Sequence, residues 1–370
     1  MTSPTKVSPD SFDDADEVVS GVLAQGPTTT PTERRWMVLW RRILVSRHLS
    51  LTLVGVLIFV FFALTTKTFL TPTNLDNMLR NVARTGVVAV GMTFVMITGE
   101  IDISVGSVFG FLTVVLGVLV ARNHVDIWIA SLITIMLGVL IGMVNGLIRT
   151  KLGIPSFIVT LAMLSAYRSL AITVSNQQPW NGPGTGFFYE ITGGKLFAIP
   201  WIGGGSLEIH AQVMWMVIAG ILFGLILART KFGYHVYATG GNLEAANQSG
   251  IRTDRIKVLC FVLVSGLCGV IALLLFGDLN IAAPITGTGF ELSAIAAVIV
   301  GGVSLTGGRG TIYGAVIGAV IIGMITSGLV LLGLSQQYGD VATGLLIVAI
   351  GTLDLLVRRA ASRSLGYLES

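Results

Sequence analysis

Residues 127–148 read IWIASLITIMLGVLIGMVNGLI, an apolar run without a charged side chain. A helix of about 20 such residues spans the hydrocarbon core of a membrane. Uncharged runs recur at 103–121, 258–277 and 310–339. In the whole chain 53% of residues are hydrophobic and 11% are charged, whereas soluble domains carry roughly 25% charged residues. The sequence therefore predicts an all-α polytopic membrane protein and excludes an ordinary soluble domain.

The apolar runs and the polar segments between them predict about ten membrane-spanning helices. We expect these helices near 49–66, 78–98, 103–121, 127–148, 154–174, 212–229, 257–277, 289–304, 311–333 and 339–357. With the N-terminus inside, most of the 23 lysines and arginines fall in cytoplasmic segments, as the positive-inside rule requires. The pattern predicts a multi-pass protein of the cytoplasmic (inner) membrane with both termini in the cytoplasm.

This topology divides the chain into four parts. Residues 1–33, rich in Ser, Thr, Pro and acidic residues, are expected to form a disordered cytoplasmic tail. Residues 34–48 interleave arginine with tryptophan, which indicates a basic segment at the lipid surface rather than a nucleic-acid-binding arm. Residues 49–357 form the membrane domain, and 358–370 a second cytoplasmic tail.

Two polar loops interrupt the membrane domain. The outer loop, 175–210, is rich in Gly, Pro and Trp, which predicts ordered structure without a long helix. It is either a lid over helix ends or a surface for an external partner. The cytoplasmic loop, 230–257, reads TKFGYHVYATGGNLEAANQSGIRTDRIK. Within it we expect a short helix over 243–249, with Asn242 as N-cap, Glu244 in the first turn and Gly250 at the C-terminus.

That short helix has two interpretations, an ordinary loop helix or a docking element for a soluble partner. A helix of two turns is marginal in water unless it packs against something. The residues alone favour the first interpretation, and the rest of the chain decides between them.

The chain lacks the motifs of an enzyme. No G-x-x-x-x-G-K-[ST] sequence is present, so we expect no nucleotide site, and the four histidines show no metal-ligand spacing. Carboxylates deep in the spans, which ion-coupled carriers use, are also missing apart from one turn. The sequence thus predicts a transport subunit that binds no cofactor or metal and is driven from elsewhere.

The exceptional turn is ITGEIDIS, between the second and third spans. Glu100 and Asp102 are candidates for a functional site, although Asp102 also fits as a cap of the helix that follows. Arg168 is expected to snorkel towards the outer surface, and Asp278 and Glu291 are expected to be solvated beside an outer loop at 280–289.

A short motif, G-[ST]-[VI]-[FY]-G, occurs twice. Residues 106–110 read GSVFG and residues 310–314 read GTIYG, and each opens a predicted span that leaves the cytoplasmic side. This repetition suggests two related halves of one membrane domain.

Four stretches resemble the membrane permease subunit of ABC importers for ribose, xylose and related monosaccharides. They are GMTFVMITGEIDISVGSVFG (91–110), GMVNGLIRTKLGIPSFIVTLAMLSAYRSLA (142–171), GYHVYATGGNLEAANQSGI (233–251) and IAAVIVGGVSLTGGRGTIYGAVIGA (295–319). Their order and spacing cover most of residues 75–350. The resemblance implies a permease domain that works as a homodimer with a cytoplasmic ABC ATPase, which binds ATP and Mg, and an extracytoplasmic sugar-binding protein.

The resemblance also implies site residues. Its ATPase-coupling segment matches Gly241, Asn242, Leu243, Glu244, Ala245, Ala246 and Gly250, although the Leu-Pro that often follows this element is absent. From motif position, we expect the translocation pathway to include Phe94, Glu100, Asp102, Ser104, Ser107, Phe109, Asn145 and Thr160. Two alternatives remain open: an ABC permease for another solute, such as a branched amino acid or a nucleoside, and an ATP-independent secondary carrier.

Overall fold

The computed structural model describes residues 47–201 and 204–366. Contacts divide the chain into Met1–Ser50 and Leu51–Ser370, and the architecture below is that of the second unit. The predicted tail 1–33 and the basic segment 34–48 up to residue 46 lie outside the described residues. So do residues 202–203 of the outer loop and residues 367–370 of the C-terminal tail.

Within the described part, ten helices coincide with the ten predicted spans. They are α3 (Arg47–Thr65), α4 (Pro72–Ile97), α5 (Val105–Gly117) continued by the π-helical segment η2 (Val118–Arg122), α6 (Ile127–Lys151), α7 (Ser156–Val174), α9 (Ala211–Arg229), α12 (Thr253–Leu279), α13 (Phe290–Val300), α14 (Ile312–Leu331) and α15 (Gln336–Gly366). Six of these helices are long and apolar enough to cross a membrane: α5 with η2, α6, α7, α9, α12 and α14. The predicted class, a polytopic helical membrane protein, is confirmed.

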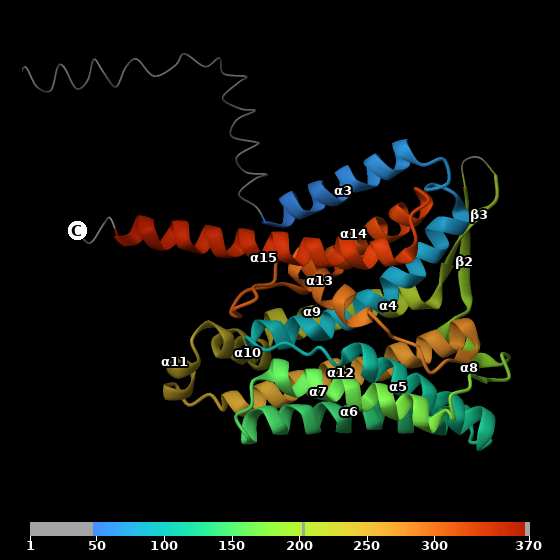
Figure 1. Cartoon of the computed structure of the whole chain (residues 1–370), viewed down its shortest axis with the longest axis horizontal. Helices are drawn as coiled ribbons and strands as arrows, with labels where there is room; N and C mark the ends of the chain where they lie inside the picture. Colours follow the sequence, from blue (N-terminus) through green and yellow to red (C-terminus); the bar gives the residue numbers. More distant parts are fainter. Residues whose placement is uncertain (1–46, 202–203, 367–370) are drawn as a thin grey trace, which may run out of the picture. The chain divides into compact units, whose positions relative to one another are not determined.

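The central helix of the unit is α4. From residue 86 to residue 97 every one of its residues is buried, as expected of a helix that is apolar on all sides. It packs against α12 and α9 and also against α13 and α14, while α12 packs against α5 and α6. Figure 1 shows α6 and α7 along one side and α14 and α15 along the other, with α4 between them.

The outer helices leave apolar faces uncovered. On α6, large side chains such as Leu132, Met136 and Leu140 are exposed, and on α9 so are Ile221 and Leu225. Exposed apolar faces of this extent suit contact with lipid or with another protein. They distinguish these helices from α4, whose apolar residues 86–97 are all buried.

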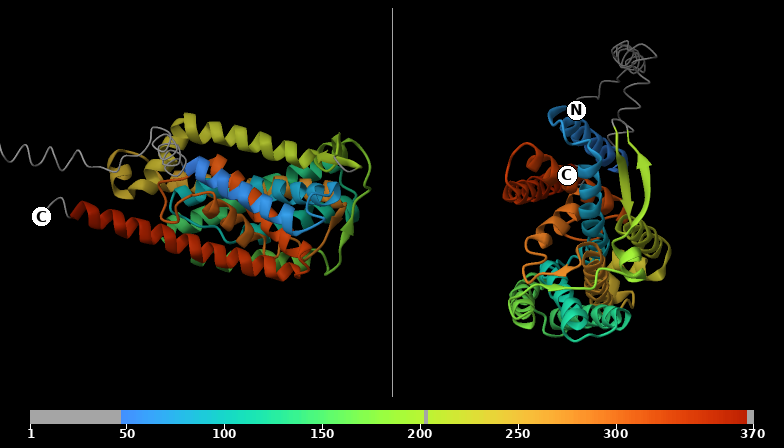
Figure 2. Two further views of the ribbon diagram at one scale, coloured as in Figure 1. Left: turned by 90° about the horizontal axis from the view of Figure 1, so that it is seen from above. Right: turned by 90° about the vertical axis from the view of Figure 1, so that its right-hand side faces the viewer.

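The described residues of the outer loop, 175–201 and 204–210, form regular structure with one short helix and no long one, as predicted. The loop contains β1 (Trp180–Asn181), α8 (Phe187–Thr192), β2 (Lys195–Pro200) and β3 (Ser206–His210). β2 and β3 form an antiparallel hairpin with a register shift between residues 195 and 197, and β1 pairs with β4 (Ile281–Ala282). The hairpin lies at the opposite end of the unit from two short helices, α10 (Lys231–Gly241) and α11 (Leu243–Gln248) (Figures 1 and 2).

Candidate functional site

α11 is the short helix predicted in the cytoplasmic loop, and its caps are those predicted. The Asn242 Oδ1 atom accepts a hydrogen bond from the backbone N–H of Ala245 at 3.0 Å, and Gly250 has a φ of +82°. Ala246 is 5% exposed, whereas the other residues of 241–250 are exposed. α11 is therefore attached to the unit by a small inner face and keeps a wide surface for another protein.

α10, which the sequence did not predict, holds α11 against the unit by backbone contact. A Cβ atom on Gly240 would lie 1.7 Å from the carbonyl oxygen of Ile97, so only glycine fits there. That carbonyl, at the end of α4, accepts a hydrogen bond from the N–H of Gly308 at 2.8 Å. The end of α10, the turn after α4 and the turn before α14 thus meet directly beside α11. These two turns precede the two copies of the repeated glycine motif.

Glu100 lies in the turn after α4 and forms an ion cluster. Its carboxylate accepts hydrogen bonds from Arg149 Nε on α6 at 2.9 Å and from Lys257 Nζ on α12 at 2.6 Å. Burial opposes ionisation of this carboxyl, but the hydrogen bonds from the two cations prevail and lower its pKa. The three side chains line a surface cavity of about 430 Å³, together with Gly240 and Leu243. The ion cluster therefore lies next to the first residue of α11.

Asp102 does not cap α5, because the N-cap residue is Ser104 and no side chain caps the first turn of the helix. Asp102 instead holds this N-cap residue in place. Its Oδ1 atom accepts hydrogen bonds from the N–H of Ser104 at 2.8 Å and from the Ser104 hydroxyl at 2.6 Å. Asn145 Nδ2 donates to the same hydroxyl at 3.1 Å, and the Tyr167 hydroxyl donates to Asn145 Oδ1 at 3.1 Å. These buried groups link α5, α6 and α7 in one chain of hydrogen bonds.

Three further pathway candidates are fully buried among the helices. Ser107 donates to the carbonyl of Ser104 at 2.8 Å, and Thr160 donates to the carbonyl of Ser156 at 2.9 Å. Phe94 packs its ring against Phe223 and Phe232. Two of the eight predicted pathway residues line a cavity. Glu100 lines the cavity beside α11, and Phe109 lines a second cavity, described next.

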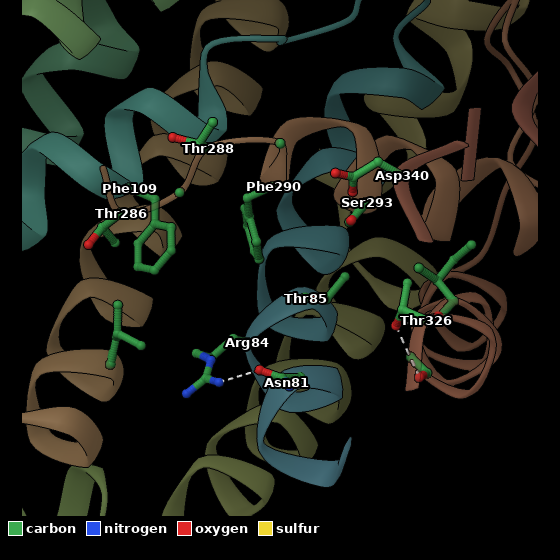
Figure 3. A pocket seen from close by; sticks show the side chains of 15 residues that line it. Asn81, Arg84, Thr85, Phe109, Thr286, Thr288, Phe290, Ser293, Thr326 and Asp340 are labelled. Carbon is green, nitrogen blue, oxygen red and sulfur yellow. Dashed lines mark hydrogen bonds between the residues drawn. The ribbon is translucent and has the colours of Figure 1, made fainter. Parts of the chain in front are cut away.

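A second cavity, of about 410 Å³, lies between α4, α5, α12, α13, α14 and α15 (Figure 3). Its polar side chains are Asn81, Arg84, Thr85, Thr286, Thr288, Ser293, Thr326 and Asp340. Phe109 and Phe290 face it with ring centroids 5.2 Å apart. This size falls in the range of small-molecule sites, and hydroxyl, amide and charged groups beside two aromatic rings suit a small polar solute.

An irregular segment, 283–289, forms one wall of this cavity. It packs against the first turns of α5: a Cβ atom on Gly110 would lie 2.1 Å from the Thr286 carbonyl oxygen, and Arg168 Nη1 donates to that oxygen at 2.6 Å. The predicted outer loop at 280–289 is therefore in contact with α5, although Ile285 within it is 77% exposed. Non-helical backbone beside membrane helices is stable where it is buried in protein or lines a watery cavity.

The expectations for the ionisable side chains of Arg168, Asp278 and Glu291, near this loop, are wrong. Arg168 is held by the Thr286 carbonyl instead of snorkelling outward, and the Oε2 atom of Glu291 is shielded from solvent. The side chain of Asp278 is 4% exposed and binds Arg80 and Arg84 of α4, each at 2.8 Å. The two arginines are one helical turn apart, so one carboxylate at the end of α12 pairs with both.

Comparison with known proteins identifies the family of this chain. The family model described as "Branched-chain amino acid transport system / permease component" matches residues 74–351. The chain is 37% identical over 286 residues to the ribose import permease protein of Bacillus subtilis (strain 168), covering 77% of this chain and 86% of that protein. The chain belongs to the ABC sugar importer permease family.

Other relatives of this permease carry different solute names. It is 33% identical to the autoinducer 2 import system permease protein of Salmonella typhi, over 86% of this chain and 89% of that protein. It is 36% identical to the L-arabinose ABC transporter permease protein of Azospirillum brasilense, over 81% and 86%. No solved structure matches the chain. Membership of this family and the apolar helices of the fold together identify the chain as a multi-pass membrane protein.

Sequence reasoning missed the partners of Glu100 and most of the cavity. Arg149 and Lys257 stand at the ends of uncharged runs, at the same predicted membrane level as Glu100, and this shared level was an available signal. Tyr167 gave no signal of its own inside an apolar span. The cavity residues come from six helices and a loop, and no local pattern unites them.

Proposed function

We propose that this permease imports a monosaccharide of the ribose or xylose type across the cytoplasmic membrane. The observation that carries the proposal is the polar cavity between α4, α5, α12, α13, α14 and α15, walled by an irregular loop. A sugar offers hydroxyls in every direction, and the cavity offers hydroxyl, amide and carboxylate partners with two aromatic rings. A branched amino acid would instead call for an apolar pocket around its side chain.

The energy for transport would come from a separate ATPase. This chain contributes no nucleotide-binding motif, and ATP and Mg would be bound by the partner subunit. Its docking site would be α11 with its flanks, residues Gly241 to Gly250, of which Ala246 packs inward and the rest are open to solvent. The chain therefore performs no bond chemistry, and its part of the mechanism is mechanical.

The remaining partners follow from the surface. A second copy of the permease and membrane lipid would cover the exposed apolar faces of α6, α7 and α9. An extracytoplasmic sugar-binding protein would dock at the end that carries the β2–β3 hairpin, and both termini would lie in the cytoplasm. Solute would pass from that protein through the polar cavity.

The test is uptake of labelled ribose, xylose and arabinose into vesicles that hold the permease, its ATPase and its binding protein. We expect uptake that requires ATP and all three components. Uptake that persists without the ATPase, or that a salt gradient alone drives, would favour a secondary carrier and refute the proposal. Transport of leucine but of no sugar would favour the branched amino acid alternative.

Two variants of α11 test the docking site within the same assay. Ala246→Asp places a charge at the buried contact of the helix, and Ala245→Pro removes the N–H that Asn242 caps. Both should abolish coupling of ATP hydrolysis to uptake, whereas Glu190→Gln, an exposed residue of α8 outside the docking site, serves as the control. Unchanged uptake and unchanged co-purification with the ATPase in both variants would exclude α11 as the docking element.

A further inference from the structure

A cluster of potential metal ligands lies at the hairpin end, away from the cavity and from α11. Asp76 of α4 and Glu208 and His210 of β3 each point one ligand atom inward, and the three atoms lie within 4.8 Å of one another. Glu208 and His210 are two residues apart on a strand, so both side chains point to the same face of the hairpin. The sequence, in which the histidines are scattered, gave no sign of this group because Asp76 is distant along the chain.

His210 Nε2 and Asp76 Oδ1, which lie 3.2 Å apart in this cluster, require a cation between them. His210 Nδ1 lies 3.0 Å from the carbonyl oxygen of Gly193, which can only accept, so Nδ1 carries the proton. In the neutral ring Nε2 is then a bare lone pair, and it faces the Oδ1 atom of Asp76 at 3.2 Å. Both atoms are shielded from solvent and neither has a hydrogen-bond partner. Two buried acceptors facing each other are unfavourable unless a metal ion or a proton lies between them.

The spacing fits a small divalent ion. Zn²⁺ binds imidazole nitrogen and carboxylate oxygen at about 2.0–2.2 Å in tetrahedral sites, which places neighbouring ligand atoms about 3.3–3.5 Å apart. His210 Nε2 is 3.2 Å from Asp76 Oδ1 and 3.8 Å from Glu208 Oε2. These distances bracket the tetrahedral value.

The surroundings orient the ligands as supporting residues do in metal sites. The Gly193 carbonyl fixes the tautomer of His210, leaving Nε2 as the ligand atom. Arg80 binds Oδ2 of Asp76 at 3.2 Å, and Lys195 binds Oε1 of Glu208. Each cation therefore holds the carboxylate oxygen that faces away from His210. Lys195 is 47% exposed, and its ammonium group competes with an ion for the Glu208 carboxylate.

We propose that Asp76, Glu208 and His210 form a three-ligand site for a first-row divalent transition metal of the Zn²⁺ class, which joins the β2–β3 hairpin to α4. Imidazole with carboxylates suits such ions rather than Mg²⁺ or Ca²⁺, which prefer oxygen ligands alone. The bound ion would hold the hairpin in one position on the first turns of α4.

The experiment measures Zn²⁺ binding to the full chain in lipid nanodiscs, purified with a tag that contains no histidine. Calorimetry and the visible spectrum of bound Co²⁺ give the stoichiometry and the coordination geometry. We expect one ion per chain in a tetrahedral environment and no competition by Mg²⁺. His210→Asn and Asp76→Asn should weaken binding at least tenfold, whereas His124→Asn, an exposed histidine with φ of 54° that asparagine tolerates, should leave it unchanged.

A further variant keeps the test decisive if those two fold poorly. Lys195→Met changes an exposed side chain and frees Glu208, so it should tighten Zn²⁺ binding several-fold. Three results would overturn the proposal: no saturable binding, binding that His210→Asn leaves unchanged, or an affinity that Lys195→Met does not raise. Thermal stability that follows pH but not Zn²⁺ would identify the occupant as a proton on His210 and would also overturn it.

Discussion

Replacing Glu100 by glutamine should destabilise the permease and weaken coupling, because it leaves Lys257 buried without a counter-charge. The side chain of Lys257 is 7% exposed and its Nζ atom is 2.6 Å from Glu100, while the side chain of Arg149 is 23% exposed. Removing one partner of a buried ion pair costs about 3–5 kcal/mol. We assign most of that cost to Lys257, since Arg149 reaches solvent.

A double-mutant cycle separates this interaction from general damage at the site. Lys257→Met alone should also destabilise, because Glu100 then keeps only Arg149. In the pair Glu100→Gln with Lys257→Met no buried charge is left without a partner, so the loss should be smaller than the sum of the two single losses by about 1–3 kcal/mol.

The assay is the free energy of unfolding from denaturant titration in mixed micelles, with ATP-driven uptake measured on the same variants. Glu190→Gln, an exposed carboxylate on α8, is the matched control and should change neither quantity. Additive losses in the cycle, or a Glu100→Gln variant as stable as the parent, would refute the argument that the cluster is a buried, coupled unit.

Three further substitutions test the contacts around α11 and the cavity. Gly240→Ala should lower stability by about 1–3 kcal/mol through overpacking and reduce uptake, whereas Gly241→Ala, where a Cβ meets nothing within 4 Å, should leave stability unchanged. Asn242→Ala removes the cap of α11 and should cost about 1 kcal/mol locally, seen as faster amide hydrogen exchange in α11 with the rest of the chain unchanged. Gly110→Ala should push the 283–289 segment into the cavity and lower the uptake rate without weakening binding of the ATPase; full uptake would argue against this cavity as the pathway.

The helices were predictable because membrane insertion imposes a local rule on the sequence. An apolar run of fixed length suffices to locate a span, so each of the ten ranges coincides with a helix. The N-cap at Asn242 was predictable for the same reason, since it depends on residues within a few positions. α10 was missed because its sequence, KFGYHVYATGG, mixes helix formers with glycine, and the close contact at Gly240 depends on α4.

The cavity and the ion pairs depend on residues far apart along the chain. Glu100 lies 157 positions from Lys257, and Arg80 lies 198 positions from Asp278, so no local pattern reports them. The loop at 280–289 was expected to lie outside, between two solvated carboxylates, Asp278 and Glu291. The 283–289 segment instead fills space beside α5, because glycines at 106 and 110 leave room for its backbone. This fit between α5 and the 283–289 segment forms only in the folded chain, so it cannot be predicted from composition alone.

The contact at Gly240 suggests how movement of α11 would reach the cavity. Ile97 ends α4, and α4 carries Arg84 and Asn81 in the cavity wall, about 20 Å away at 1.5 Å per residue. Gly308 precedes α14, which lines the same cavity with Ile322 and Thr326. One junction beside α11 therefore connects to two packed helices that both line the proposed pathway. Because close-packed helices shift as rigid bodies rather than bend, a displacement of α11 would move both walls of the cavity together.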